Sequence, residues 1–595
     1  MKGKNKNANI FGLLKSEYAR KLFLRYLPKY LLGIVCLGVI DYLQTTIPLY
    51  IGEIIDGLKT GTVNLNNIWD ILILIIICTV VIIIGRIAWR LFIFGSARNI
   101  ERDIRNDIFS HLENLSSDFY SKHKTGEIMA YITNDINAVR QSMGQAFLMI
   151  IDVVFLCVFT IFNMVANINV SLTILAVIPL IFIALTTFLL GPHIYERFSK
   201  KQAAFADMSD FVQENLSGMN VVKSFTQENN EIKAFEKINQ NYFSKNIHLV
   251  KLRAAIQPIM RAIAGLSLAI AVGYGGYIAL DGAISVGEFA AFIQYLGMLV
   301  WPMMAIGMAI NIVTMGSAAL ARIDKILKEP CEITDENADE NITNIDGNIK
   351  IDDLNFSYNN TTNDVLKGIK FEVKEGETLG IVGRTGTGKT TLVNLLMRLY
   401  NADENKIFIG EHEISTIPLK VLRSNIGYVP QDNFMFSMSV EDNVKLADID
   451  MNHEDVINAC KAACVHENIV GFADGYDTLV GERGVTLSGG QKQRISIARA
   501  LIKNPKILVL DDSVSAVDTD TEEQILNYIK TNRKNKTNII IAHRISTLMH
   551  ADKIIVIDEG EIIEAGTHDE LVDIGGLYNS LYQKQLLNSD MEEGV

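Results

Sequence analysis

Long apolar segments separated by polar stretches dominate the first half of the chain. They predict six helices, at residues 28–52, 68–94, 145–167, 170–192, 258–280 and 287–316. A helix needs about 20 mostly apolar residues to cross the hydrocarbon core of a bilayer, and each segment reaches that length. The last two are rich in glycine, and Pro302 is expected to kink the sixth. The pattern predicts an all-α membrane domain of six helices.

The gaps between these segments differ in length and charge. Residues 95–144 and 193–257 form two long gaps rich in Lys and Arg, whereas the short gap at 57–67 carries Lys59 as its one base. The positive-inside rule places the long gaps and the Lys-rich N-terminus in the cytoplasm. Both long gaps lack Pro and have apolar residues at helical spacing, which predicts helices that extend well beyond the membrane and turn back. Because the first apolar run continues past Ile40, a retained helix is expected rather than a cleaved signal peptide.

The second half of the chain has the pattern of an α/β domain. Residues 328–348 are acidic and rich in Asn, which predicts a linker, and strand-like alternation begins at Ile349. A strand-like run (377–382) and a helix-like run (391–400) enclose Gly383–Thr391, which matches the phosphate-loop motif G-x-x-x-x-G-K-[ST]. In such a loop the backbone N–H groups surround phosphates, the helix N-terminus adds positive charge, Lys389 pairs with the outer phosphates and Thr390 offers its hydroxyl to Mg²⁺. The nucleotide-binding residues predicted here are Gly383, Arg384, Thr385, Gly386, Thr387, Gly388, Lys389, Thr390 and Thr391.

Net charge and cysteine usage narrow the possible partners and the expected redox environment of the chain. The formal net charge of −13 argues against a nucleic-acid partner. The six cysteines have no metal-ligand spacing, and three of them lie in apolar runs, so a reduced setting is expected for the second half.

A second string, Leu487-Ser488-Gly489-Gly490-Gln491, is the signature of ATP-binding-cassette (ABC) ATPases, and with it the chain resembles that family. The resemblance implies that Ser488, Gly489, Gly490 and Gln491 bind nucleotide, and that Tyr358 stacks on adenine. It further implies that Gln431 reaches Mg²⁺, that Asp511 holds Mg²⁺ and that His543 contacts the γ-phosphate. Val480–Gly484 and Ser515–Asp518 match two more strings of the family, the second being its D-loop.

The first half resembles the transmembrane domain of ABC exporters. Thr125–Ile128 with Thr133–Ile136 is similar to the first intracellular loop of these exporters, and Glu214–Gly218 with Val222–Phe225 to the second. By resemblance, short coupling helices lie near Asp118–Thr125 and Met208–Glu214. The implied organisation is a cytoplasmic segment (1–27), a six-helix transmembrane domain with long intracellular extensions (28–327), a linker (328–348) and an α/β P-loop ABC ATPase domain (349–590).

One position departs from the family pattern. Members that hydrolyse ATP efficiently carry Glu after the Mg²⁺ aspartate, where it polarises the attacking water, but this chain has Asp512. Aspartate is shorter by one methylene, roughly 1.5 Å, and a displacement of about 1 Å can cost on the order of 100-fold in rate. Asp512 is therefore expected to be a poor catalytic base.

The resemblance implies a dimer, because ATP in this family lies between the phosphate loop of one chain and the signature of another. A heterodimer is favoured, in which the intact signature completes a competent site on a second half-transporter; a homodimer is the alternative. The expected function is ATP-driven export of a small amphipathic molecule, drug, lipid or peptide across the plasma membrane, with ATP and water giving ADP and phosphate. An ATP-regulated channel and an importer of the same fold remain open. Among polar residues in the apolar runs, Asp41 and Asp152 are hypothesised to line the substrate cavity and to favour cations.

Overall fold

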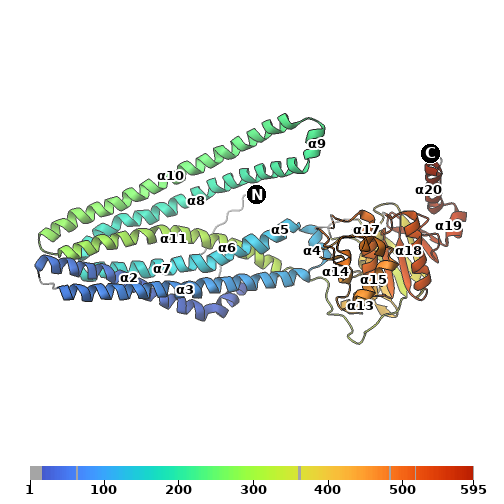
Figure 1. The fold of residues 1–595 in the computed structure, drawn as a ribbon, viewed down its shortest axis with the longest axis horizontal. Coiled ribbons are helices and arrows are strands. Elements are labelled where there is room, and N and C mark those ends of the chain that lie inside the picture. Colours follow the sequence, from blue (N-terminus) through green and yellow to red (C-terminus); the bar gives the residue numbers. More distant parts are fainter. Residues whose placement is uncertain are drawn as a thin grey trace. The chain divides into compact units, whose positions relative to one another are not determined.

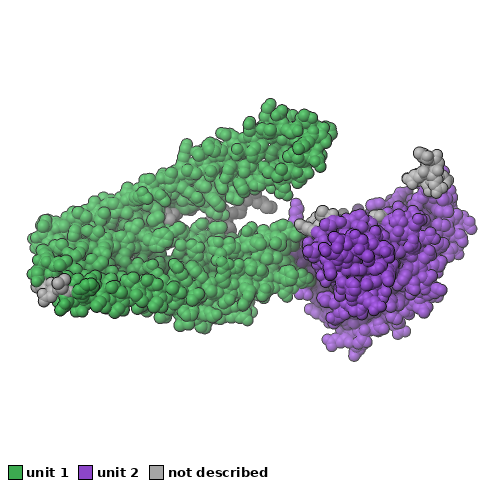
Figure 2. All heavy atoms as spheres, in the orientation of Figure 1, with its two compact units in different colours: residues 1–113, 125–329 green, residues 114–124, 330–595 purple. Residues whose placement is uncertain are grey.

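The structure of this protein is a computed structural model that describes residues 16–61, 65–359, 363–481, 484, 486–515 and 517–593. The chain forms two compact units (Figure 2). The helical unit comprises Met1–Glu113 and Thr125–Glu329, and the ATPase unit comprises Asn114–Lys124 and Pro330–Val595. A short stretch from within the first half of the sequence therefore belongs to the second unit.

Long helices build the helical unit (Figure 1). The six longest are α2 (Glu17–Thr60), α3 (Leu65–Glu113), α7 (Phe147–Asn167), α8 (Val170–Ser217), α10 (Glu228–Leu280) and α11 (Val286–Leu327). Three short helices accompany them, α5 (Thr125–Ala130), α6 (Ile136–Gln141) and α9 (Met219–Ser224), with π-helical turns at Tyr131–Asp135 and Ser142–Ala146. All six predicted apolar segments lie on the long helices, which confirms the helical class of this half.

Several of these helices are long and apolar enough to cross a membrane. Within the described residues they are Glu17–Thr60, Asn66–Glu113, Thr125–Asn167, Glu228–Leu280 and Val286–Leu327, and α8 begins with a shorter apolar stretch, Val170–Ile183. A helix rises about 1.5 Å per residue, so the 48 residues of α8 exceed a bilayer core more than twofold. The predicted extension of helices beyond the membrane is confirmed by these lengths.

The position predicted for the second coupling helix is wrong. Met208–Glu214 lies inside the continuous helix α8, because this stretch has no Gly or Pro to stop it. The helix ends at Gly218, and the separate short helix is α9, Met219–Ser224, at the tip formed by α8 and α10 (Figure 1). A short helix, α4 (Ser117–Lys122), overlaps the position predicted for the first coupling helix, Asp118–Thr125.

Two sheets form the framework of the ATPase unit. The smaller has the order β2-β1-β4-β5, with β1 Ile349–Phe356, β2 Leu366–Val373, β4 Ile407–Ile409 and β5 His412–Glu413. The larger has the order β10-β9-β3-β8-β7-β6, and its strands are β3 Thr378–Gly383, β6 Ile426–Val429, β7 Ile507–Asp511, β8 Thr537–Ile541, β9 Lys553–Asp558 and β10 Glu561–Gly566. All its neighbouring pairs are parallel except β9 with β10.

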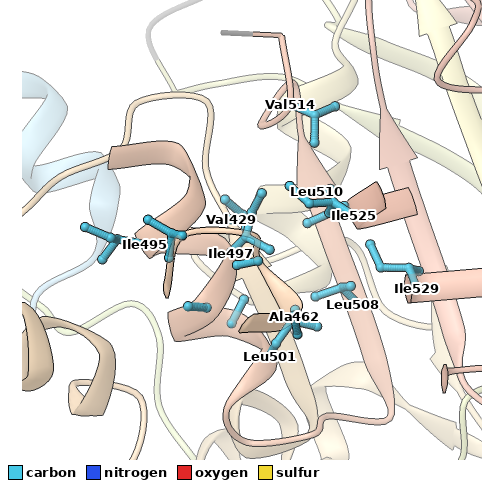
Figure 3. Close-up of a cluster of buried hydrophobic side chains, with 14 of the residues drawn as sticks. Val429, Ala462, Ile495, Ile497, Leu501, Leu508, Leu510, Val514, Ile525 and Ile529 are labelled. Carbon is cyan, nitrogen blue, oxygen red and sulfur yellow. The ribbon is translucent and has the colours of Figure 1, made fainter. Parts of the chain in front are cut away.

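Helices surround these sheets. Besides α4 they are α12 (Lys389–Leu396), α13 (Leu419–Asn425), α14 (Val440–Lys445), α15 (His453–Ala462), α16 (His466–Val470), α17 (Gly489–Leu501), α18 (Thr519–Asn532), α19 (His568–Ile574) and α20 (Leu577–Glu593). Strand β7 is buried on both faces: Leu508 and Leu510 join one apolar cluster, and Ile507 and Val509 join another. Parallel strands covered on both faces have such continuous apolar sequences. Figure 3 shows Leu508 and Leu510 with side chains from α17 and α18.

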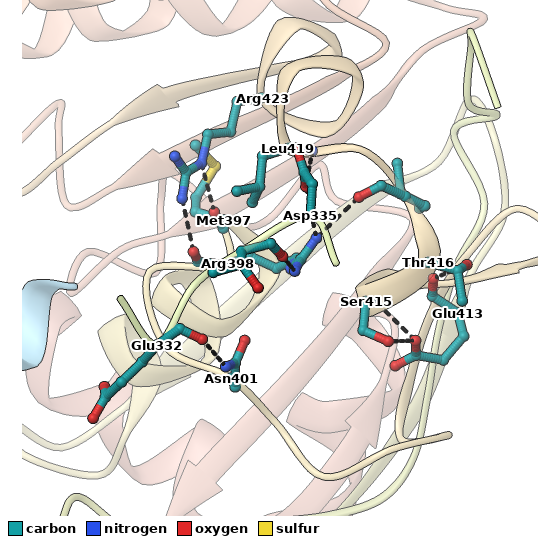
Figure 4. A network of polar contacts seen from close by, with 12 residues as sticks. Glu332, Asp335, Met397, Arg398, Asn401, Glu413, Ser415, Thr416, Leu419 and Arg423 are labelled. Carbon is teal, nitrogen blue, oxygen red and sulfur yellow. Dashed lines mark hydrogen bonds and ion pairs between the residues drawn. The ribbon is translucent and has the colours of Figure 1, made fainter. Parts of the chain in front are cut away.

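Polar contacts tie the residues that follow α11 to the ATPase unit (Figure 4). The guanidinium of Arg398, 4% exposed, donates to the carbonyls of Thr334 and Ile417, both at 2.9 Å. Asp335 accepts from the backbone N–H of Leu419 at 2.9 Å. Burial lowers the pKa of Arg398, and the neighbouring Asp335 opposes that shift. Residues 332–335 are therefore held against the domain rather than extending freely.

Candidate functional site

The carboxyl ends of four neighbouring parallel strands bring the predicted site residues to one edge of the large sheet. Strand β3 ends at Gly383 and β7 ends at Asp511. Gln431 follows β6 by two residues, and His543 follows β8 by two residues. The register aligns Ile541 of β8 with both Ile381 and Asp511. Ligands of open α/β sheets bind at this edge, so the fold places the phosphate loop, the two aspartates, the glutamine and the histidine in one region.

Glycines let the phosphate loop adopt its path between β3 and α12. Gly386 and Gly388 have φ values of +85° and +97°, which side chains rarely tolerate. A Cβ atom at Gly388 would lie 2.6 Å from Leu366, so this position also has no room for one. Arg384, Thr385 and Gly386 are exposed at the crest, and Thr387 is buried beneath it. The crest of the loop is thus open, and phosphate binding by such loops uses their backbone N–H groups.

Lys389 lies on the inner side of the same loop. It is the first residue of α12, is 7% exposed, and donates through Nζ to the carbonyls of Gly383 and Arg384 at 2.9 and 2.7 Å. Burial lowers the pKa of this ammonium, whereas the charges of Asp511 and Asp512 raise it. An ammonium has three donors, so it can hold the loop and still address an anion.

The residues at the end of β7 fit a divalent cation. Asp511 is 2% exposed, and its Oδ2 has no hydrogen-bond partner among the described residues. Burial raises the pKa of Asp511, and a hydrogen bond from Thr390 opposes the shift. Thr390 is exposed in the first turn of α12, and its side chain bonds to Asp511. A buried carboxylate oxygen beside a threonine hydroxyl is a donor set that Mg²⁺ uses in phosphate sites.

The backbone around Asp512 is fixed. This residue has φ +47°, uncommon for a residue with a side chain. Its N–H donates to the carbonyl of Ile541 at 2.8 Å, and its carbonyl accepts from Ser515 Oγ at 3.0 Å. Gln493 donates to the same carbonyl at 3.5 Å. Because these hydrogen bonds hold the main chain at both its N–H and its carbonyl, the backbone of Asp512 cannot easily move toward the nucleotide to offset the shorter side chain.

Tyr358 packs beside the start of α12. Its hydroxyl is 2.9 Å from Thr391 Oγ1. Its ring makes edge contacts with Phe356 and Tyr400, each at a centroid distance of 5.1 Å. These contacts place the ring next to the phosphate loop, and adenine stacking by Tyr358 remains a prediction.

The signature string caps helix α17. Ser488 is the N-cap, and it forms a capping box with Gln491: the Gln491 N–H donates to Ser488 Oγ, and the Ser488 N–H donates to Gln491 Oε1 at 2.9 Å. Leu487 anchors the string in the core, while Ser488 and Gly489 are exposed, and beyond its own helix turn no described residue has an atom within 4 Å of a Cβ built at Gly489. Gly490 follows in the first turn. The string is therefore an open, positively polarised helix start.

A pocket of 350 Å³ joins the phosphate loop to the histidine. It is lined by Gly383, Arg384, Thr385 and His543, together with Lys584 and Gln585 of α20. His543 and Gln431 are both exposed, the first beyond β8 and the second beyond β6. Glu482, Arg483 and Ala516, which belong to two predicted family strings, lie outside the described residues.

Sequence reasoning assigned no role at this site to three residues that the fold brings to this region. Glu522 of α18 and Gln585 of α20 both bond to the segment that follows His543. Asp118 of α4 belongs to the ATPase unit and accepts from Asn359 at 3.3 Å, next to Tyr358. Gln585 has no local sequence signal, and the family resemblance indicated Asp118 only as the start of a coupling helix. A carboxylate in the first turn of α18 is a helix-start signal that could have drawn attention to Glu522.

Comparison with known proteins agrees with this geometry. Residues 30–303 match the family described as ABC transporter transmembrane region, and residues 366–515 match the ABC transporter family. A relative from Bacillus subtilis (strain 168), "Probable multidrug resistance ABC transporter ATP-binding/permease protein YheI", is 37% identical over 96% of this chain and 98% of its own length. The chain belongs to the ABC transporter family. It joins one transmembrane region to one ATPase domain, which makes it a half-transporter and an ATP-hydrolysing translocase.

Further similarities cover nearly the whole half-transporter. The "Multidrug resistance-like ATP-binding protein MdlA" of Escherichia coli (strain K12) is 33% identical over 97% of both chains. Among solved structures, "Structure of a bacterial Atm1-family ABC exporter with ATP bound" matches with a TM-score of 0.76 at 26% identity, covering 95% of this chain and 98% of the other. These matches support ATP-driven export by a multi-pass membrane protein. The exporter fold implies dimerisation and ATP binding.

Proposed function

We propose that this chain is one half of a heterodimeric exporter in which its own phosphate-loop site is degenerate. The observation that carries the proposal is Asp512, which stands where efficient family members have Glu. The fixed backbone of Asp512 supports it, because hydrogen bonds to Ile541 and Ser515 keep the chain from moving toward the substrate. The signature Leu487–Gln491 is intact and open. The chain thus offers a weak site of its own and a complete signature to a partner.

In this proposal each predicted site residue of the ATPase unit has a defined role. The loop from Gly383 to Thr391 holds the phosphates of ATP through backbone N–H groups, and Lys389 neutralises their charge. Asp511 and Thr390, with Gln431, would hold Mg²⁺, which supplies positive charge to the β- and γ-phosphates when bound. Asp512 orients water weakly, and His543 contacts the γ-phosphate. Ser488, Gly489, Gly490 and Gln491 contact the nucleotide bound to the partner.

In the membrane, the proposed cycle follows the exporter fold. Closure of the two ATPase domains on ATP draws in the coupling helices α4 and α9, and the transmembrane cavity switches from inward-facing to outward-facing. The chain resides in the plasma membrane with its N-terminus and ATPase unit in the cytoplasm. The substrate is a small amphipathic molecule, drug, lipid or peptide.

The heterodimer is tested by purifying the chain alone and with the half-transporter that copurifies from its native cells. We expect the chain alone to hydrolyse ATP about 100-fold more slowly than the pair, because misplacing a catalytic base by about 1 Å has an effect of this size. Steady-state phosphate release in lipid nanodiscs measures both rates. Robust ATPase activity and transport by the chain alone would establish the homodimer instead.

A buried carboxylate supports a preference for cationic substrates. Asp41 of α2 is 3% exposed, and its Oδ2 lacks a hydrogen-bond partner within the described residues. Asp152 and Arg86 are near enough to interact with it electrostatically. When both carboxylates are ionised, the two acids and one base carry a net negative charge in this part of the helical unit.

Asp41→Asn is therefore expected to reduce efflux of cationic dyes by about tenfold, a factor that corresponds to ~1.4 kcal/mol, and to leave neutral dyes unaffected. Asp152→Asn is expected to act in the same direction. Dye efflux from cells that express the transporter measures both. Unchanged efflux of all cationic dyes by both variants would remove the assignment.

A further inference from the structure

The C-terminal helix α20 is bonded directly to the segment that carries His543. The side-chain amide of Gln585 donates from Nε2 to the carbonyl of His543 at 2.7 Å. The same amide accepts, through Oε1, a hydrogen bond from the N–H of Ile545 at 2.8 Å. One side chain thus bridges two backbone groups around the turn that follows β8. These contacts lie at the pocket shared with the phosphate loop.

The chemistry of this bridge requires an amide. The His543 carbonyl can only accept and the Ile545 N–H can only donate, so the group between them must offer one donor and one acceptor. A carboxylate would keep the second bond but place negative charge against the carbonyl. An aliphatic side chain would lose both bonds and leave the Ile545 N–H and the His543 carbonyl without these partners.

Helix α20 is itself firmly attached, so Gln585 can act as a fixed point. Tyr578 is fully buried in the core, and Leu577 and Leu581 pack against the same cluster. The carboxylate of Glu564 accepts from the N–H groups of Leu577 and Tyr578 at the start of the helix. The bridge therefore ties the histidine turn to a rigid element and not to a loose terminus.

The far side of the same segment has a second anchor. Glu522 on α18 is 4% exposed and accepts from Arg544 Nη1 at 3.0 Å and from the hydroxyl of Thr547. Residues 544–547 are thus fixed from α18, while the carbonyl of His543 is held from α20. His543 itself remains exposed between these anchors.

We propose that Gln585 is the positioning residue that sets the orientation of His543 toward the terminal phosphate of ATP. The inference rests on the proposed contact of His543 with the γ-phosphate. Gln585 acts through the backbone, by fixing the carbonyl of His543 and the N–H of Ile545. Its loss lets the turn rotate, so that the imidazole spends less time facing the phosphate. ATP is affected and ADP is not, because ADP has no γ-phosphate.

The test measures ATP and ADP affinity of the full-length chain by competition with a fluorescent nucleotide. Gln585→Ala and His543→Ala are both expected to weaken ATP binding by about tenfold, the scale of one hydrogen bond to a charged group, with ADP affinity unchanged. Gln585→Glu, which retains one of the two bonds, is expected to weaken ATP binding at least as much. Gln583→Ala is the matched control, since Gln583 is exposed on the same helix and, among the described residues, bonds to Asn579 of that helix. In the His543→Ala background, Gln585→Ala should add nothing.

Each other outcome has a separate meaning. If His543→Ala weakens ATP binding and Gln585→Ala does not, the positioning role of Gln585 is overturned and the role of His543 stands. If His543→Ala has no effect, the proposed phosphate contact fails and this inference fails with it. Equal loss of ATP and ADP affinity in Gln585→Ala, or a further loss in the His543→Ala background, shows a general structural role and overturns the proposal.

Discussion

Replacing Asp512 by Glu is expected to raise the ATPase rate of the purified chain by about 100-fold, since the base then gains the ~1.5 Å it lacks. The structure makes this a clean substitution. Asp512 is partly exposed, and the hydrogen bonds that fix its backbone involve only main-chain atoms of this residue. The longer side chain can therefore extend without disturbing them. Steady-state phosphate release at saturating ATP measures the gain.

A matched variant separates the effect of side-chain length at position 512 from the effect of its negative charge. Asp512→Asn keeps the length of the side chain and removes its negative charge, so it should lower the residual rate further, because a neutral amide cannot take a proton from water. If Asp512→Glu leaves the rate unchanged while Asp512→Asn also has no effect, this position does not control hydrolysis, and the proposed degeneracy is contradicted.

The sequence predicted the fold where a strong local signal exists. The aliphatic runs required membrane-length helices, and the glycines and lysine of 383–391 required a turn between a strand and a helix. The order of the strands was not accessible in the same way: β3 lies between β8 and β9, which follow it by more than 150 residues in the chain. Pairings over that separation depend on tertiary packing, which no local pattern records. The second coupling helix was misplaced because a string of matching letters does not show where a helix stops.

In the candidate site, too, some residues were predictable from local motifs and others only from the folded chain. Lys389, Thr390 and Asp511 were predicted from motifs, and the structure brings them together at one edge of the sheet. The contacts of Gln585 were not predictable, since a glutamine in a polar C-terminal helix is ordinary by composition. The role proposed for it rests on the two hydrogen bonds that join α20 to the turn after β8. Long-range polar pairs of this kind need the folded chain before they can be recognised.

Disabling the signature of this chain is expected to lower the ATPase rate of the copurified pair far more than disabling its phosphate loop. Gly489→Asp is expected to lower ATPase activity by about 100-fold or more, because it places a negative charge where the signature should meet a phosphate, and one lost electrostatic contact of this kind costs 10²–10³-fold. Folding should be unaffected: beyond its own helix turn, a Cβ at Gly489 meets no atom of the described part of the chain within 4 Å, and a carboxylate at a helix start stabilises the helix.

Lys389→Ala disables the phosphate loop of the same chain, and the heterodimer predicts a smaller loss for it, at most about tenfold, because the site it belongs to already turns over slowly. Gly489→Ala is the control for size, since it adds the Cβ without the charge. In a homodimer each ATP site contains both motifs, so Gly489→Asp and Lys389→Ala would inactivate the transporter equally. Phosphate release from the purified pair distinguishes these cases: unequal losses mean that the signature of this chain serves the faster site, and equal losses would reject the asymmetry.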